Sequence, residues 1–136
     1  MAPMLFLFAC QPEKTPEDTG PLFDDDQPHI VIVSPENGDP VGTCFTMDVE
    51  VYNFEIVSPV TNTTQVDGQG HWHVDFGDRW FDCESLDCHV DITGLETGQA
   101  ILIAALVDNL HFAVANEMGE MVEDSGIFVY TPASCQ

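Results

Sequence analysis

The sequence predicts an all-β fold, an antiparallel β-sandwich of about seven strands. Short runs of β-branched and other apolar residues are separated by segments rich in Gly, Pro, Asn and Asp, the residues that favour turns. In residues 45–52, apolar and polar side chains alternate with the period of two that is typical of a strand buried on one face. No segment has the periodicity of an amphipathic helix. The 136 residues leave room for one domain and a tail.

Each predicted strand corresponds to one apolar run with turn residues at its ends. The first run is β-branched and stops at Ser-Pro-Glu-Asn-Gly-Asp-Pro. Glycine-rich or acidic segments separate the later runs, which is the pattern of strands joined by short turns. The runs are residues 30–33, 45–52, 71–76, 89–92, 100–107 and 127–130.

Three features in this order resemble secreted bacterial immunoglobulin-like domains. They are the opening strand followed by Ser-Pro-Glu-Asn-Gly at residues 34–38, the Gly-His-Trp-His segment at 70–73, and Thr-Gly-Leu-Glu-Thr-Gly at 93–98 before an apolar strand. The resemblance covers residues 29–132 and implies an immunoglobulin-like β-sandwich. Because this fold serves many functions, the resemblance implies a structural or interaction domain without naming its partner.

The charge of the chain is strongly negative. Against 24 Asp and Glu residues stand only Lys14 and Arg79, which gives a formal net charge of −22. Such a surface repels nucleic-acid phosphates, so we expect no nucleic-acid partner, while metal ions and cationic partners remain compatible. The sequence also lacks a nucleophile elbow, a phosphate-binding loop and a dinucleotide-binding fingerprint, and we therefore predict that it is not an enzyme.

Residues 1–10 form an apolar run that ends at Cys10. The sequence Leu-Phe-Ala-Cys at its end resembles the lipobox of bacterial lipoprotein signal peptides. The resemblance implies an exported protein whose Cys10 is acylated, with the lipid as its membrane partner and the domain facing the periplasm or the cell surface. The alternative is a buried N-terminal strand. Residues 11–28 are rich in Pro and acidic residues and predict a linker, and residues 29–136 form the predicted domain.

Four further cysteines form an even set, which favours two disulfides in an exported chain. Cys83 and Cys88 flank only four residues, so a local bridge between them is favoured, and Cys44 would then pair with Cys135. The alternative is a metal site in which cysteine thiolates near His89 act as ligands. An oxidising compartment favours the disulfides.

The segment His71-Trp72-His73 is the candidate metal-binding motif. Alternation along a strand places both imidazoles on one face and the indole on the other. Two such imidazoles can chelate copper or zinc, and His111, after the apolar strand, could supply a third. Asp75 lies on the same strand face as a potential oxygen ligand or supporting partner.

The same strand resembles the copper-binding strand of copper–zinc superoxide dismutases, a β-sandwich family in which His-x-His runs into Phe-Gly-Asp. Here the two histidines run into Val-Asp-Phe-Gly-Asp at residues 74–78. The resemblance implies copper ligation by His71 and His73. The zinc-loop histidines and the guiding arginine of that family are absent, so superoxide dismutation is not implied. Met118 and Met121 could add thioether ligands for Cu(I), although methionine also commonly fills gaps in cores.

Three functions follow from these observations. The leading prediction is an envelope-anchored lipoprotein whose domain binds a protein partner in the envelope. The alternative is a periplasmic or cell-surface copper- or zinc-binding protein that uses His71, His73 and His111. A metalloenzyme with the same histidines is the third. If the histidines instead only form local hydrogen bonds or pack beside Trp72 and Trp80, the protein binds no metal.

Overall fold

The chain folds into two β-sheets packed as a β-sandwich, and the computed structural model describes residue 23, residues 25–133 and residue 135. Nine strands and no helix are present among these residues. Cys10, its signal segment and residues 11–22 of the predicted linker lie outside the described residues. Within the described residues, no helix is long and apolar enough to cross a membrane.

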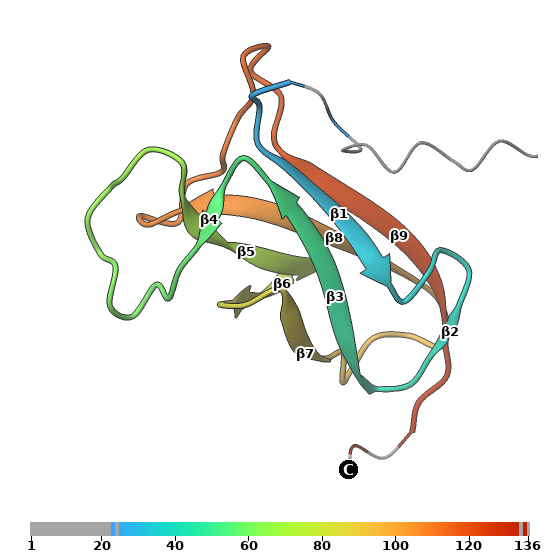
Figure 1. Ribbon diagram of the computed structural model, residues 1–136. Coiled ribbons are helices and arrows are strands. Elements are labelled where there is room, and N and C mark those ends of the chain that lie inside the picture. Colours follow the sequence, from blue (N-terminus) through green and yellow to red (C-terminus); the bar gives the residue numbers. More distant parts are fainter. Residues whose placement is uncertain (1–22, 24, 134, 136) are drawn as a thin grey trace, which may run out of the picture.

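The smaller sheet has three antiparallel strands in the order β1-β3-β7. Figure 1 shows β1 and β3 crossing over β8 and β5 of the other sheet. The edge strand β7 is short and alternates strictly between exposed and buried residues. The bounds are β1 (His29–Ser34), β3 (Cys44–Tyr52) and β7 (Asp87–Asp91).

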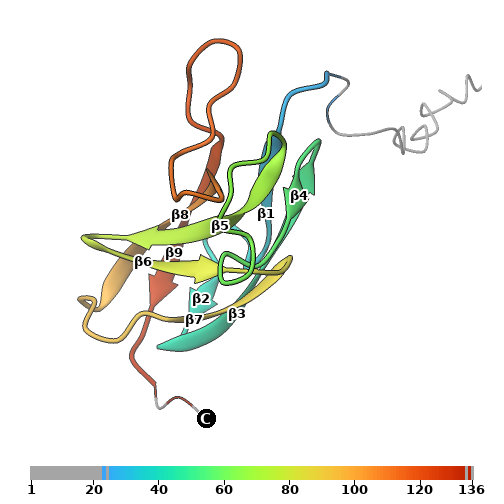
Figure 2. The same cartoon turned by 90° about the vertical axis from the view of Figure 1, so that its left-hand side faces the viewer.

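The larger sheet has six strands and curls into a half-barrel. Its order is β2-β9-β8-β5-β4, and β6 pairs with β5 as well. Most pairs are antiparallel, whereas the β2–β9 and β4–β5 pairs are parallel. Figure 2 shows β5 and β6 side by side. The bounds are β2 (Pro40–Val41), β4 (Glu55–Ile56), β5 (Gln69–Phe76), β6 (Arg79–Cys83), β8 (Gly98–Asp108) and β9 (Glu123–Tyr130).

The all-β prediction is confirmed, and each of the six apolar runs falls on a strand, although the run 89–92 extends one residue past the end of β7. Three strands were not predicted, which makes nine instead of about seven. Two of these strands form the short parallel pairs β2–β9 and β4–β5 at the edges of the otherwise antiparallel sheet. The strands β2 and β4 have two residues each, too few for any periodicity to register. The strand β6 lies at an edge and is mostly exposed, so it carries no continuous apolar run.

The core lies between the two sheets, and β5 supplies its centre. Trp72, Val74 and Phe76 point into the core and are at most 2% exposed. The indole nitrogen of Trp72 donates a hydrogen bond to the carbonyl oxygen of Ser85 at 2.7 Å, which satisfies its one polar atom. Because strand side chains alternate, the odd-numbered residues of β5 face the opposite side of this sheet. His71 and His73 therefore lie outside the sandwich core.

Two disulfides close the fold, with the pairings predicted from the spacing. Cys44 pairs with Cys135, which ties the C-terminal region to the start of β3, and Cys83 pairs with Cys88, which joins β6 to β7 and so links the two sheets. The thiolate alternative is wrong because all four sulfurs are in disulfides. Two disulfides in one small domain indicate an extracytoplasmic protein.

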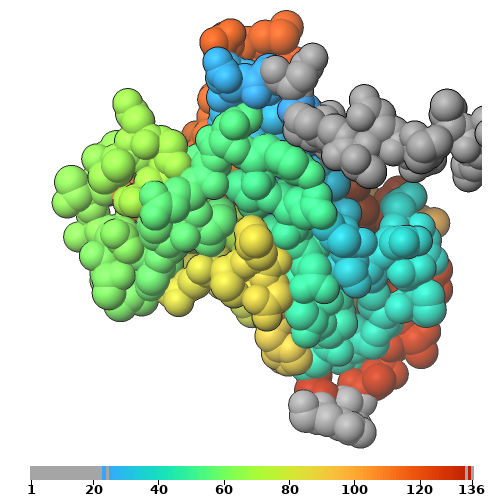
Figure 3. Space-filling model, viewed as in Figure 1, coloured from blue at the N-terminus to red at the C-terminus, as the bar shows by residue number. Residues whose placement is uncertain are grey.

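The described end of the predicted linker contacts the domain. Phe23 stacks on His29 with ring centroids 3.6 Å apart, and the Asn53 amide donates hydrogen bonds to the carbonyl oxygens of Asp25 and Gln27. The chain is therefore ordered against β1 and β3 before residue 29. On another side of the molecule, the segment between β4 and β5 protrudes as a lobe (Figure 3).

Candidate metal centre

Two histidines of β5 lie on the outer face of the larger sheet and are nevertheless buried. His71 is 0% exposed and His73 is 8% exposed. Their cover comes from neighbouring rings: Trp80 of β6 stacks on His73 with centroids 4.4 Å apart, and the His111 ring lies 4.7 Å from that of His71. The prediction that the two imidazoles share one face, opposite Trp72, is confirmed. His111, the third predicted ligand, also joins them.

The hairpin between β5 and β6 adds a carboxylate to the two imidazoles. Its turn has two residues, Gly77 and Asp78, and Gly77 adopts a φ of 62° that glycine accommodates readily. In the resulting register His73 pairs with Asp82, which places both side chains on the outer face. Asp82 Oδ1 lies 2.9 Å from His71 Nε2 and 2.7 Å from His73 Nε2.

The turn after β8 places His111 next to His71 and Asp82. The carboxylate of Asp108 accepts hydrogen bonds from the backbone N–H groups of Leu110 and Phe112 at 2.8 and 3.0 Å, which fixes the turn. His111 has a φ of 66°, a left-handed conformation that few residues other than glycine adopt. Its Nδ1 lies 3.7 Å from Asp82 Oδ1. Backbone strain of the kind that the positive φ of His111 represents often occurs at functional sites, where the surrounding structure holds the residue in place.

The geometry of the four side chains fits a metal ion. One ligand atom from each of His71, His73, Asp82 and His111 lies within 4.8 Å of the other three. Zinc bonds of about 2.0–2.1 Å in a tetrahedron place neighbouring ligand atoms about 3.4 Å apart. The distances between ligand atoms in the cluster run from 2.7 Å (His73 Nε2 to Asp82 Oδ1) to 3.7 Å (His111 Nδ1 to Asp82 Oδ1), with 3.2 Å between the two Nε2 atoms of β5. They lie on either side of the tetrahedral distance. This cluster could hold one metal ion.

Burial keeps the two β5 histidines in the form that binds metal. Loss of solvent lowers the pKa of His71 and of His73, and the Asp82 carboxylate opposes part of that decrease. Metal ligation requires the neutral imidazole with a free lone pair. Burial therefore prepares both side chains for ligation near neutral pH. Asp75 is half-buried, and desolvation raises the pKa of its carboxyl group.

The lowered pKa of each of these histidines predicts a loss of stability in acid. In the unfolded chain both imidazoles take up protons near pH ~6.5, whereas in the folded chain they do so only at lower pH. Between those values the unfolded state binds more protons, so the free energy of unfolding falls as the pH falls. We expect the urea midpoint, followed by tryptophan fluorescence, to decrease from pH 7.5 to pH 5.5 in metal-free protein.

In a His71→Ala/His73→Ala variant this decrease should shrink, since the two titrating groups are gone. An equal pH dependence in the variant would show that other groups cause it.

Other predicted ligands lie elsewhere. Asp75 shares the outer face with His73, but the carboxylate that contacts the imidazoles belongs to Asp82. Met118 is 82% exposed and borders a hollow beside residues 25–27. Met121 borders another hollow, next to β1. Both methionines thus line hollows that His29 borders, and these hollows contain none of His71, His73 and His111. No cysteine thiolate is available, since those of the described residues form disulfides.

Asp82 was missed by the sequence analysis, although a signal for it was present. The pair Gly77-Asp78 stands between two β-prone segments and is a favourable two-residue hairpin turn. Counting outward from such a turn pairs residue 76 with 79, and therefore His73 with Asp82. Recognising the hairpin would have identified the carboxylate.

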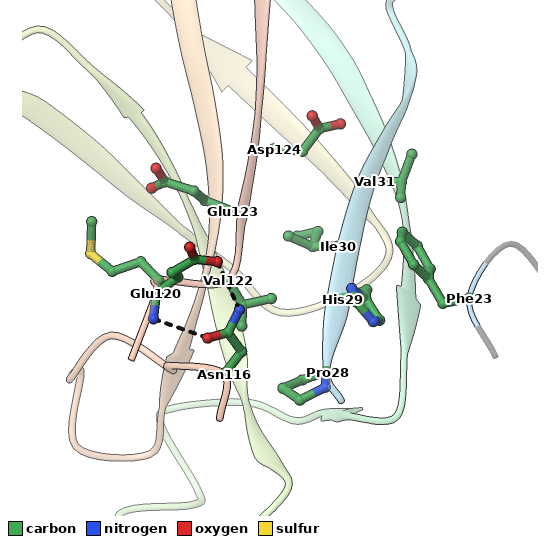
Figure 4. Close-up of a pocket in the computed structure, with 11 residues that line it drawn as sticks. Phe23, Pro28, His29, Ile30, Val31, Asn116, Glu120, Val122, Glu123 and Asp124 are labelled. Atoms are coloured by element: carbon green, nitrogen blue, oxygen red, sulfur yellow. Dashed lines mark hydrogen bonds between the residues drawn. The ribbon is translucent and has the colours of Figure 1, made fainter. Parts of the chain in front are cut away.

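A separate hollow lies between β1 and the residues that lead into β9. Figure 4 shows Glu120 and Glu123 on one side of it and His29 on the other. Asp124 borders it as well, and its carboxylate accepts a hydrogen bond from the Ile32 N–H at 2.8 Å, which ties β9 to β1. Asp124 has a structural role in this tie, and none of the cluster residues lines the hollow.

Comparison with known proteins shows the fold and no family. No family model matches the chain, and no curated protein matches its sequence. The structure is similar to part of an endo-beta-1,4-mannanase from Thermotoga petrophila, with a TM-score of 0.50 and 12% sequence identity. The match covers 86% of this chain and 21% of the mannanase chain, so this chain spans about a fifth of that protein. At this identity the likeness concerns the all-β fold alone.

Proposed function

We propose that this domain binds one zinc or copper(II) ion outside the cytoplasm, through His71, His73, His111 and Asp82. The observation that carries the proposal is the convergence of these side chains from β5, β6 and the turn after β8. The two disulfides support an extracytoplasmic location for the site.

Hydrogen bonding alone accounts poorly for this cluster. If His71 and His73 both donate through Nε2 to Asp82 Oδ1, two protonated nitrogens face each other at 3.2 Å. In that arrangement His71 Nδ1 is also buried without a partner, which costs about 1–3 kcal/mol. A cation among the three rings removes the first problem, because each nitrogen then presents a lone pair. A metal ion is therefore the better explanation of why these polar groups are packed together.

The ligand set supports the choice of metal. Three imidazole nitrogens and one carboxylate oxygen suit Zn(II) and Cu(II), whereas Cu(I) prefers sulfur ligands. Four protein ligands would fill a tetrahedral zinc site, as in structural and binding sites, while catalytic zinc sites keep a position open. The proposal is accordingly a metal-binding protein and not an enzyme. Asp82 and His111 are partly exposed, so the ion can exchange with solvent from that side.

An interaction role in the envelope is the second candidate. It is favoured by exposed apolar side chains next to the cluster: Trp80 is 54%, Leu110 48% and Phe112 66% exposed. Such grouped apolar side chains commonly contact a protein partner. In this proposal Cys10 carries the lipid anchor, and the immunoglobulin-like domain presents the apolar side chains to an envelope protein. The net charge of −22 disfavours nucleic acid as the partner.

Metal analysis of the unmodified protein tests the first proposal. The chain is exported to the periplasm so that both disulfides form, purified without a histidine tag, and exposed to Zn(II) or Cu(II) before extensive dialysis. We expect one equivalent of metal by mass spectrometry and a 1:1 end point in calorimetric titration. A protein that is folded by circular dichroism and retains neither metal would refute the proposed function.

A further inference from the structure

Two buried side-chain atoms among the described residues have no hydrogen-bond partner, and they are Nδ1 of His71 and Oδ1 of Asn109. His71 belongs to the proposed metal centre, and Asn109 stands directly after β8 with 4% of its surface exposed. Buried polar atoms in folded proteins nearly always have a partner. Both atoms therefore require an explanation.

The orientation of the Asn109 amide is determined by its contacts. Its Nδ2 donates to the carbonyl oxygen of Thr64 at 2.8 Å and to Oε1 of Gln69 at 3.0 Å. A backbone carbonyl can only accept, so the atom that faces Thr64 must be the nitrogen. Oδ1 therefore occupies the other position, and it is an acceptor without a donor.

The pairing of β5 with β8 brings Asn109 to the end of β5 that carries His71. Val107 pairs with His71 and Asp108 pairs with Gly70, where the ladder ends, and Asn109 follows as the first residue of the turn, on the side of Gln69. Its hydrogen bond to the Gln69 side chain puts its amide on the face that Gln69 and His71 share, two residues apart on β5. Residues in this diagonal relation on adjacent strands are within reach of each other's long side chains.

The chemistry of the two atoms is complementary once a metal is bound. If His71 ligates metal through Nε2, its ring proton must reside on Nδ1, which becomes a donor. Metal-ligating histidines almost always donate this second N–H to an acceptor, which fixes the tautomer and the ring orientation. We propose that Asn109 is a positioning residue of the metal centre, whose Oδ1 accepts the Nδ1–H of His71 directly or through one water molecule.

This inference rests on the proposed metal-binding function and adds a step to it. Without metal, we infer that His71 Nε2 donates to Asp82 Oδ1, because an ionised carboxylate can only accept, and Nδ1 then carries a lone pair. On metal binding the Nε2 proton leaves to water, and water supplies a proton to Nδ1, so the charge of the ring does not change. Metal binding therefore switches the tautomer of His71, and Asn109 stabilises the tautomer of the metal-bound form.

Nuclear magnetic resonance tests the switch in the unmodified chain. In protein labelled with 15N at histidine, long-range 1H–15N spectra distinguish the two tautomers of His71. We expect the Nε2–H form in metal-free protein and the Nδ1–H form after one equivalent of Zn(II). Zinc-loaded protein in which His71 keeps its Nε2 proton would overturn the inference.

Three variants test the part played by Asn109. Asn109→Leu removes the acceptor and should weaken zinc binding by about 10–100-fold in competition titrations, the usual effect of losing such a partner. Asn109→Gln keeps both the amide donors and the acceptor, so it should recover part of that loss. Gln69→Leu is the matched control, because it removes a contact of the Asn109 nitrogen and leaves Oδ1 in place. Its affinity should stay close to that of the unmodified protein.

The possible results separate this inference from the proposed function. If the unmodified protein binds neither Zn(II) nor Cu(II), both fail. If it binds zinc and Asn109→Leu binds equally well, only the role of Asn109 is refuted. If Asn109→Gln or Gln69→Leu is as weak as Asn109→Leu, general packing of the turn explains the loss, and the positioning role is refuted as well.

Discussion

Replacing His71 and His73 together by alanine is expected to abolish metal binding. The two imidazoles supply half of the proposed ligand atoms, and their Nε2 atoms lie within 3.2 Å of each other and within 2.9 Å of Asp82 Oδ1. The remaining pair, Asp82 and His111, would leave an ion largely hydrated. We expect the affinity to fall by more than about 100-fold, beyond the usual effect of losing a partner that only supports a ligand. The measurement is retained metal after dialysis, together with competition titration.

The chain offers a matched control for this variant. His29 and His89 lie away from the cluster, so His29→Ala/His89→Ala removes the same number of imidazoles and leaves the proposed centre intact. This control should retain a full equivalent of metal. Equal losses in the two double variants would indicate nonspecific binding by surface histidines. Near-ultraviolet circular dichroism of both proteins shows whether the fold is preserved.

Replacing Trp72 by alanine is expected to lower the free energy of unfolding by about 3–5 kcal/mol, the usual cost of deleting a buried aromatic side chain. The indole is 0% exposed between the two sheets, and its nitrogen is bonded to the carbonyl of Ser85. A domain of this size is stabilised by only about 5–15 kcal/mol in total, so this variant would lose a large share of its stability. Trp72→Phe keeps most of the volume and should fold with a smaller loss, which urea unfolding can measure.

Trp80 provides the contrast, because the second tryptophan of the chain is 54% exposed. Trp80→Ala should change the free energy of unfolding by no more than about 1 kcal/mol, as expected for a surface position. Similar losses for Trp80→Ala and Trp72→Ala would contradict the arrangement in which β5 supplies the centre of the core.

Local patterns in the sequence were sufficient for much of the fold. Alternation over residues 45–52 identified β3, and alternation within β5 placed Trp72 in the core and His71 with His73 on the opposite face. These predictions succeed because a strand reverses its side chains at every residue, so faces can be assigned from sequence alone. The short spacing of Cys83 and Cys88 likewise identified one disulfide, and the remaining two cysteines formed the other.

Other features depend on pairing between distant segments. The strands β2 and β4 exist only as short parallel pairs at the two edges of the larger sheet, and two residues are too few for a sequence pattern to predict a strand. Asp75 was the more obvious carboxylate because it shares a strand with His73, yet Asp82 is the one that reaches the imidazoles. Cross-strand neighbours lie about 4.5–5.5 Å apart, closer than residues two apart on one strand.

The sequence by itself determined the all-β class, the face shared by His71 and His73, and the availability of His111 as a third imidazole. Only the tertiary structure decided that His111 meets them, because its position depends on the turn that Asp108 fixes after β8. The hairpin register brought in Asp82, and the end of the β5–β8 pairing holds Asn109 against Gln69, two residues before His71. Strand periodicity is a local property of the chain, whereas a ligand cluster forms from side chains that only the packing of the sheet brings together.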